Sequence, residues 1–351
     1  MTLRTGLLLL GEHPPGRLLD LATQAEALGF DYLWYADERF YREVYSGLTL
    51  CAHRTTRLRL GPCVTDPYSR HPALTAMAIA TLDEVSGGRA VLGLGAGVSG
   101  FRELGVARRR PAVAIGEAIH VIRALLRGET VTYQGTVVSV HGAALNFSPP
   151  RPEVPIYVAS NAPQGLETAG RLAEGAIMQG CVADAALAYF RAHVARGAQR
   201  AGRRLEAVDL VARINVCIHD DPAVARDVMR RSVAVSLIAQ QPTFPGFAAA
   251  GLDVPPEIRQ AVAGLPYGYL GDAAAQVAPL VPDQFVDALT LAGPVEAVAA
   301  GVARMVRAGI TQFVIYPLAP DRQIERTIER FATEVLPKAA TMTASPAHPA
   351  G

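Results

Sequence analysis

Short apolar segments alternate along the chain with longer segments whose apolar residues recur at helical spacing. One helical segment places Leu18, Leu21 and Ala25 on a single face and ends at Gly29, a residue type that commonly closes helices. The short segments have the length and the apolar content of buried strands. Eight such strands are predicted: Leu3–Leu10, Asp31–Tyr35, Arg57–Gly61, Ala90–Leu94, Ile156–Ala159, Ala176–Gln179, Leu210–Val216 and Gln312–Tyr316.

Eight strands that alternate with helices predict an α/β fold, the (β/α)8 TIM barrel. An open, doubly wound sheet is the alternative, because short apolar segments do not fix the order of the strands. In a barrel, the carboxyl ends of the strands form the face on which binding and catalytic residues gather. The residues that follow each strand are therefore the first candidates for a site.

Two segments are additional to the strands and helices that a minimal barrel needs. Residues 131–147 alternate about a turn at Gly135, which predicts a small hairpin insertion. Residues 237–293 predict a helical excursion over the barrel mouth. Either insertion could instead pack against another subunit. That segment carries aromatic residues at Phe244, Phe247, Tyr267, Tyr269 and Phe285.

No linker divides the chain, so we predict a single domain over residues 1–337, insertions included. Pro337 predicts the end of the last helix, since proline cannot continue a helix interior. The small residues and prolines of residues 338–351 predict a disordered tail.

Composition narrows the classes of function. Half of the residues are hydrophobic, 19% are charged and the formal net charge is +1. So small a charge gives no field that would attract nucleic acid or an anionic membrane, and we expect neither as a partner. Four scattered cysteines lack the spacing of a zinc site or a disulfide framework, so we expect no metal and a cytoplasmic location.

The second and third predicted strands end in polar clusters. Trp34 lies in the second strand, which is followed by two acids, Asp37 and Glu38, that could accept hydrogen bonds from a ring or supply a proton. A helix cap or a salt bridge would also explain these acids. The turn over residues 63–72 includes Tyr68 and could carry functional residues. A rigid loop before a helix is the simpler interpretation of this turn.

The fourth and fifth predicted strands end in small residues. Gly93–Gly100 imitates a dinucleotide fingerprint but opens no helix where one is required, so it better suits a loop that lets a flat ring approach the backbone. Ser160 and Asn161 precede a helix whose first N–H groups could bind a phosphate. Simple capping by Ser160 or Asn161 is the alternative.

Two further groups are candidates. Glu12 and His13 follow the first predicted strand and could exchange protons, although a single histidine is more often structural. Arg108–Arg110 could hold the anionic tail of a cofactor, and a solvated surface run is the simpler interpretation.

Together these segments resemble the luciferase-like monooxygenase superfamily, and most closely its branch of methylenetetrahydromethanopterin reductases and related deazaflavin-dependent oxidoreductases. The most specific segments are Gly61–Ala73, Leu92–Gly97, Pro155–Ser160 and Glu103–Gly105. The resemblance is strongest over residues 29–203 and holds in outline beyond them.

The resemblance implies a bacterial luciferase-like TIM barrel whose mouth binds coenzyme F-420 (F420), an 8-hydroxy-5-deazaflavin, or FMN in other branches. It implies a cis peptide bond between Cys63 and Val64, against the back of the ring. Many relatives carry His where this chain has Glu38, so Glu38, His13 and Glu12, in that order, are the candidate proton donors. The implied cofactor contacts are Asp37, Cys63, Val64, Thr65, Gly97, Ser99, Ser160, Asn161, Ala162, Gly180 and Cys181, and the implied substrate-pocket residues are Tyr68 and Trp34.

The resemblance therefore predicts a homodimeric oxidoreductase that transfers a hydride between F420 and a small organic substrate, for instance to reduce a C=C or C=N bond in secondary metabolism. Two alternatives stay open: an FMN-dependent monooxygenase on the same scaffold, and a barrel that binds a partner without catalysis.

Overall fold

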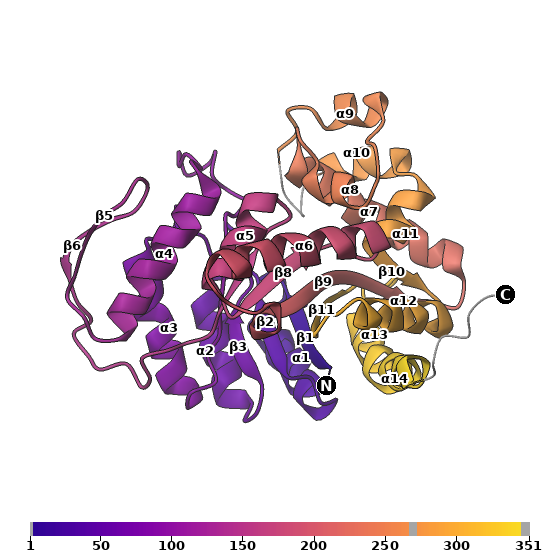
Figure 1. Cartoon of the computed structure of the whole chain (residues 1–351). Helices are drawn as coiled ribbons and strands as arrows, with labels where there is room; N and C mark the ends of the chain where they lie inside the picture. Colours follow the sequence, from indigo (N-terminus) through magenta and orange to yellow (C-terminus); the bar gives the residue numbers. More distant parts are fainter. Residues whose placement is uncertain (1–2, 267–271, 345–351) are drawn as a thin grey trace. The chain divides into compact units, whose positions relative to one another are not determined.

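The computed structural model describes residues 3–266 and 272–344. These residues group into two compact units. Of the described residues, the N-terminal unit comprises 5–178 and 192–211, and the C-terminal unit comprises 3–4, 179–191, 212–266 and 272–344 (Figure 1). The single domain over residues 1–337 stays a prediction.

A parallel sheet is the frame of the N-terminal unit. Its strands lie in the order β1-β2-β3-β4-β7-β8, and a bridge between Leu60 and Ala90 joins β3 to β4. Because all of these strands are parallel, their carboxyl ends lie at one edge of the sheet. The strand bounds are β1 Arg4–Leu9, β2 Tyr32–Tyr35, β3 Arg59–Pro62, β4 Leu92–Gly95, β7 Ile156–Ala159 and β8 Gly175–Gln179.

Helices follow these strands along the chain. Several of them begin with proline, which costs nothing at a position where the N–H has no helical partner. Each buries an apolar face, as α1 does with Leu18, Leu21 and Ala25. The bounds are α1 Pro15–Ala27, α2 Val44–Arg54, α3 Pro72–Ser86, α4 Pro111–Leu126, α5 Pro163–Leu172, α6 Asp184–Arg200 and η1 Leu205–Ala207.

The predicted hairpin insertion is confirmed. Strands β5 (Val131–Gln134) and β6 (Ser139–Ala143) are antiparallel and lie beside α4 (Figure 1). The carboxylate of Glu117, on α4, accepts the backbone N–H groups of residues 136–138 at 2.6–2.9 Å. This one side chain therefore ties the hairpin turn to the helix.

The C-terminal unit contains strands β9 (Asp209–Ile218), β10 (Thr290–Gly293) and β11 (Gln312–Pro317). Strand β10 is parallel to β9, and the end of β11 lies beside β9 through a hydrogen bond from Leu318 N to Val216 O of 2.8 Å. All eight predicted strands are thus present, as β1–β4, β7–β9 and β11. The sequence analysis missed β10, whose four residues follow a helix directly.

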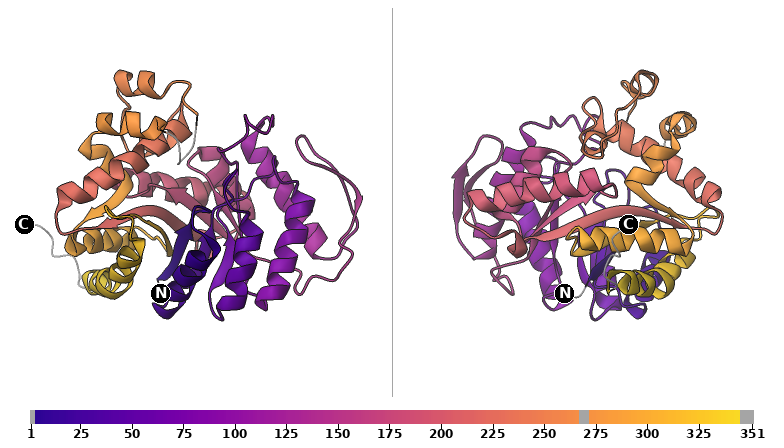
Figure 2. Two further views of the ribbon diagram at one scale, coloured as in Figure 1. Left: turned by 180° about the vertical axis from the view of Figure 1, so that it is seen from behind. Right: turned by 45° about the vertical axis from the view of Figure 1, so that its right-hand side comes forward.

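The segment over residues 237–293 is helical, as predicted. Phe247 contacts both Phe244 and Phe285, with ring centroids 6.3 and 5.5 Å apart, so aromatic packing joins α8 to α11. Figures 1 and 2 show α8, α9 and α10 grouped on one side of α7. The predicted aromatic residues Tyr267 and Tyr269 lie outside the described residues. The bounds are α7 Pro222–Gln240, α8 Pro245–Ala249, α9 Pro256–Val262, α10 Ala273–Val277, η2 Ala278–Leu280 and α11 Asp283–Leu289.

The predicted helix end at Pro337, and the predicted disorder that begins at Lys338, are wrong as far as Ala344. A π-helical turn, η3 (Phe331–Val335), follows α13 (Ile324–Arg330) and leads into α14 (Leu336–Ala344). Pro337 is the second residue of α14, which continues the helical backbone of η3. Helix α14 packs against α12 (Val295–Arg307), and Lys338 pairs with Glu296 of that helix. Residues 345–351 of the predicted tail lie outside the described residues.

A substitution at Gly61 tests how closely β3 packs against the backbone at Val91, just before β4. A Cβ at Gly61 would lie 2.0 Å from the carbonyl oxygen of Val91, which is fixed backbone. We expect Gly61→Ala to lower the free energy of unfolding by about 3 kcal/mol. The control is Gly16→Ala in α1, where a Cβ would meet nothing within 4 Å; it should be neutral or stabilising by up to about 1 kcal/mol. Urea denaturation that finds the two variants alike would contradict this packing.

The pH dependence of stability tests whether the Glu117 carboxylate anchors the hairpin to α4. Burial raises the pKa of Glu117, but the three backbone N–H donors outweigh burial and lower that pKa below its ordinary 4.5. A lowered pKa means that the carboxylate stabilises the fold above pH 4.5 and loses this effect as pH falls through the folded-state pKa.

We therefore expect Glu117→Gln to cost about 2 kcal/mol of unfolding free energy at pH 7. The difference from wild type should shrink as pH falls below about 4.5. Glu153→Gln, at an exposed position, is the control and should change little at any pH. Urea denaturation at several pH values measures both, and a pH-independent difference would refute the anchor.

Candidate functional site

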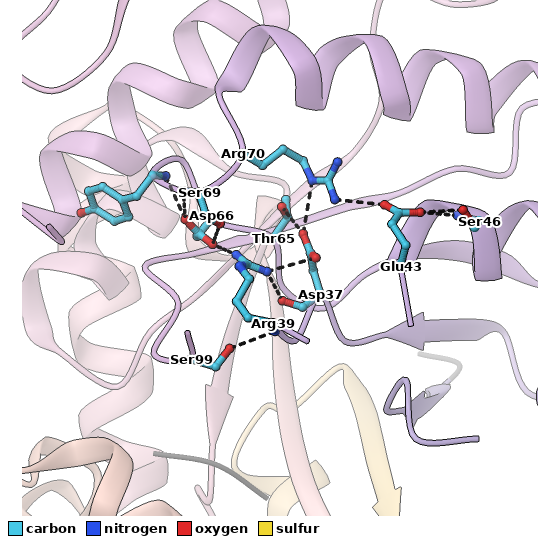
Figure 3. A network of polar contacts seen from close by, with 10 residues as sticks. Asp37, Arg39, Glu43, Ser46, Thr65, Asp66, Ser69, Arg70 and Ser99 are labelled. Atoms are coloured by element: carbon cyan, nitrogen blue, oxygen red, sulfur yellow. Dashed lines mark hydrogen bonds and ion pairs between the residues drawn. The ribbon is translucent and has the colours of Figure 1, made fainter. Parts of the chain in front are cut away.

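The candidate site lies at the carboxyl edge of the sheet in the N-terminal unit. The segments after β1, β2, β3, β4 and β7 all lie at this edge, because these strands are parallel neighbours. They carry most of the predicted site residues. A network of polar side chains links the segments that follow β2 and β3 (Figure 3).

Asp37 is at the centre of this network. Its Oδ2 accepts the Thr65 hydroxyl at 2.7 Å and lies 3.4 Å from Arg70 Nε, and its Oδ1 lies 3.1 Å from Arg39 Nη1 (Figure 3). The Asp37 side chain is 9% exposed. Its carboxylate is therefore already engaged by three protein groups.

Asp66 forms the second centre. It is fully buried and accepts the backbone N–H groups of Tyr68 and Ser69 at 2.8 Å and the Ser69 hydroxyl at 2.7 Å. Its remaining partner is Arg39, whose guanidinium forms an ion pair with it. Arg39 thus bridges two carboxylates, Asp37 and Asp66, that belong to different segments (Figure 3).

Arg70 extends the network toward α2. Its Nη2 lies 3.0 Å from Glu43 Oε1, and its guanidinium lies 4.9 Å from the ring centroid of Tyr45. Burial lowers the pKa of Arg70, but Asp37, Tyr45 and Glu43 raise it more, so the pKa is raised overall. Glu43 also caps α2 by accepting Ser46 N–H at 2.7 Å. Three carboxylates against two guanidiniums leave the network with one negative charge in excess.

Glycines let the loop after β4 pack closely on this network. A Cβ at Gly95 would lie 2.5 Å from Cγ2 of Val64, and a Cβ at Gly100 would lie 2.3 Å from the Arg39 Cβ. Ser99 adds a polar link, because its hydroxyl accepts the backbone N–H of Arg39 at 3.3 Å. The loops after β2, β3 and β4 therefore form one continuous wall.

The turn after β3 has the form that the resemblance implies. The Cys63–Val64 peptide bond is cis, as predicted, and both residues are half-buried. Thr65 is fully buried, with its hydroxyl on Asp37, so we expect it to hold that side chain and not to touch a cofactor. The hydroxyl of Tyr68 donates to the carbonyl of Arg109 at 2.9 Å, and burial raises its pKa.

Trp34, predicted to line the substrate pocket, is a core residue. Its ring is fully buried, stacked on Tyr32 with centroids 5.7 Å apart and edge-on to Tyr157 at 5.5 Å. A ring covered on its face and its edge cannot line an open pocket. Phe40, which the sequence analysis did not single out, is 73% exposed at the end of the β2 segment and has a positive φ of 66°.

The start of α5 suits an anion. The Ser160 hydroxyl accepts the N–H of Ala162 at 3.0 Å, and Gly165 is needed because a Cβ there would lie 2.2 Å from that hydroxyl. Within the described residues, the N–H groups of Gln164 and Gly165 have no acceptor, and the first turn holds no acidic residue. Such a helix start can bind a phosphate. Asn161, the second residue of the predicted turn, is half-buried beside Ser160.

The predicted proton donors lie after β1 and β2. His13 is buried, with Nε2 3.7 Å from the Glu12 carboxylate, and Arg42 donates to the Gly11 and Glu12 carbonyls at 3.0 Å. Glu38 is half-buried next to Asp37 in the chain.

The remaining predicted cofactor contacts are Gly97, Gly180 and Cys181. Gly97 has a φ of 61°, and its carbonyl accepts a hydrogen bond from Arg108, so one of the three arginines supports the loop itself. Gly180 and Cys181 belong to the C-terminal unit, and their role as cofactor contacts stays a prediction. Burial raises the pKa of the Cys181 thiol to about 12.

Arg39, Glu43 and Asp66 were not among the predicted site residues. A helix and a strand separate Arg39 from Asp66 and Glu43 from Arg70, so no local spacing reveals these two pairs. A weak signal exists: Asp66 precedes Tyr68-Ser69 as in an Asx turn, in which the side chain binds the backbone two residues later.

The chain belongs to the luciferase-like monooxygenase family, whose sequence model matches residues 3–312. Similarity to individual relatives extends over nearly the whole chain. It is 34% identical over 317 residues to 5,10-methylenetetrahydromethanopterin reductase of Archaeoglobus fulgidus, covering 90% of this chain and 93% of that protein. It is 30% identical over 341 residues to F420-dependent glucose-6-phosphate dehydrogenase of Kineococcus radiotolerans, covering 93% and 94%.

The solved structure of the coenzyme F420 dependent tetrahydromethanopterin reductase from Methanopyrus kandleri is also similar. It has a TM-score of 0.83 and 30% identity, with 96% of this chain and 99% of that chain covered. This likeness confirms the (β/α)8 barrel class and excludes the doubly wound sheet. No helix in the described part of the chain is long and apolar enough to cross a membrane. Within the same residues, no cluster of His, Cys, Asp and Glu could hold a metal ion.

Asp66→Asn tests the bridge made by Arg39. The substitution removes the buried charge that faces the guanidinium, and we expect it to cost about 3 kcal/mol of unfolding free energy. Glu129→Gln, in the exposed Arg127–Glu129 pair, is the matched control and should cost less than about 0.5 kcal/mol. Urea denaturation compares the two variants, and equal small losses would mean that the bridge contributes little.

Proposed function

We propose that the protein is an F420-dependent oxidoreductase that transfers a hydride between the deazaflavin and a small organic substrate. The observation that carries the proposal is the similarity, over 96% of the chain, to a solved F420-dependent reductase. We further propose that the protein is a cytoplasmic homodimer, as the family resemblance implies.

The residues present suit such a cofactor. The start of α5 offers unengaged N–H groups to a phosphate. The glycine loop after β4 and the turn at Val64 form a wall against which a flat ring can lie. Exposed apolar side chains at Phe40 and Val98 are available to cover such a ring.

When bound, F420 supplies a carbon that accepts or donates a hydride. The protein must hold the ring, exclude water and exchange one proton with the substrate. Asp37 is engaged by Thr65, Arg39 and Arg70, so we assign it to holding the loops. Glu38, beside it in the chain, is then the proposed proton donor, with His13 and Glu12 as the alternatives.

Titration with F420 and with FMN, followed by fluorescence quenching, tests the cofactor. We expect F420 to bind with micromolar affinity and FMN at least tenfold more weakly, that is, by about 1.4 kcal/mol. Asp37→Ala should weaken F420 at least about tenfold, because it releases the side chains that hold the loops. Tighter binding of FMN would favour the monooxygenase alternative, and binding of neither would favour a non-catalytic barrel.

Glu38→Gln tests the proton donor once a substrate is found. We expect kcat to fall by about 100-fold with the F420 dissociation constant unchanged, since the amide keeps the shape but cannot donate a proton. The control is Glu103→Gln at an exposed position, which should leave both constants unchanged. If the Glu38→Gln variant kept full activity, His13 or Glu12 would be the proton donor instead.

A further inference from the structure

The loop between β4 and α4, residues 96–110, carries a segment that belongs to no strand or helix. We call residues 101–109 of this loop the arm. Most of the arm is exposed. Its internal backbone hydrogen bonds are those of tight turns, such as the bond from Val106 N to Phe101 O at 2.9 Å. The arm is therefore folded on itself and projects from the sheet edge that carries the candidate site.

The residues on either side of the arm are fixed. The Ser99 hydroxyl accepts the N–H of Arg39 at 3.3 Å, and the carbonyl of Arg110 accepts the N–H of Ala114, in the first turn of α4, at 3.0 Å. Gly100 and Arg110, which flank the arm directly, have left-handed φ angles of 69° and 47°. The chain thus turns sharply at both ends of the arm, and rotation about these two residues would move the arm as a unit.

One side chain holds the arm in place. The Tyr68 hydroxyl donates to the carbonyl of Arg109 at 2.9 Å, and the Tyr68 ring lies edge-on to the ring of Phe101, with centroids 5.9 Å apart. Among the described residues, the bond to Arg109 is the one hydrogen bond that joins the arm to the chain outside residues 97–110. Tyr68 is itself fixed, because Asp66 accepts its backbone N–H at 2.8 Å. Tyr68 therefore connects both ends of the arm to the polar network.

Apolar side chains around the arm are exposed. Leu104, within the arm, is 45% exposed, and Val98, just before it, is 38% exposed. The ring of Phe40 lies at the base of the arm, since a Cβ at Gly100 would be 3.3 Å from it. Burial of apolar surface is favourable, so closure of the arm over a flat ring would remove from water side chains that are exposed in this state.

We propose that the arm is a lid over the candidate site, latched by Tyr68, that opens for F420 to enter and leave. The arm continues the wall against which the ring would lie. The identity of the ligand rests on the proposed function, whereas the latch does not. One neutral hydrogen bond and one ring contact are weak enough to break on the time scale of lid motions.

Limited digestion with trypsin reports the opening of the arm without any cofactor. The arm contains Arg102, Arg108 and Arg109, and trypsin cuts after arginine where the backbone opens locally. Cleavage after Arg127, an exposed residue at the end of α4, is the reference within the same molecule. Mass spectrometry of the fragments separates the two regions.

Tyr68→Phe removes the hydroxyl and keeps the ring. We expect the arm of this variant to be cut about fivefold faster than that of wild type, the effect of one neutral hydrogen bond, with cleavage after Arg127 unchanged. Tyr68→Ala also removes the ring contact and should be cut faster still. The control is Tyr133→Phe, which removes the hydroxyl of a half-buried tyrosine on β5 of the same unit and should match wild type.

F420 then tests whether the arm covers the ligand. Saturating F420 should slow cleavage of the wild-type arm at least about tenfold, because the bound ligand favours the closed arm. In stopped-flow binding, Tyr68→Phe should raise the association and dissociation rate constants of F420 by about fivefold each and leave the dissociation constant within about a factor of two. Loss of a direct ligand contact would raise the dissociation rate alone.

Three results would overturn the proposal. The first is equal cleavage of the arm in wild type and Tyr68→Phe, and the second is unchanged cleavage of the wild-type arm at an F420 concentration that quenches its fluorescence. The third is a faster dissociation with an unchanged association rate in Tyr68→Phe, which would make Tyr68 a contact of the ligand. Failure of wild type to bind F420 would refute the proposed function, and the cleavage rates without cofactor would still decide whether Tyr68 latches the arm.

Discussion

The ion pairs made by Arg39 are the interaction on which the candidate site depends. Its side chain is 12% exposed, and its guanidinium lies between the carboxylates of Asp37 and Asp66, which follow different strands. Two acids this buried would repel each other without a cation between them. Because Asp66 also binds the turn at Tyr68 and Ser69, the bridge joins the segment after β2 to the whole turn after β3.

This constraint decides which side chains are available for chemistry. The carboxylate oxygens of Asp37 are bound by Thr65, Arg70 and Arg39. A residue that could supply a proton, judged from the sequence, is therefore assigned to holding the loops. Glu38 follows Asp37 directly in the chain and is half-buried. The wall is completed by glycines, since a Cβ at Gly100 would collide with the Arg39 side chain. On the proposed function, Asp37 therefore holds the loops, and its neighbour Glu38 exchanges the proton.

The apolar pattern was sufficient to predict all eight barrel strands and the hairpin, because strand length and burial leave a local signature. The pattern did not predict β10, a strand of four residues that lacks such a signature. It also predicted that the last helix ends at Pro337, whereas the packing of α14 against α12 outweighs the local effect of proline. The site was predicted by position, at the strand ends. The pairing of Arg39 with Asp66 was not, since ion pairs between distant segments depend on the folded chain alone.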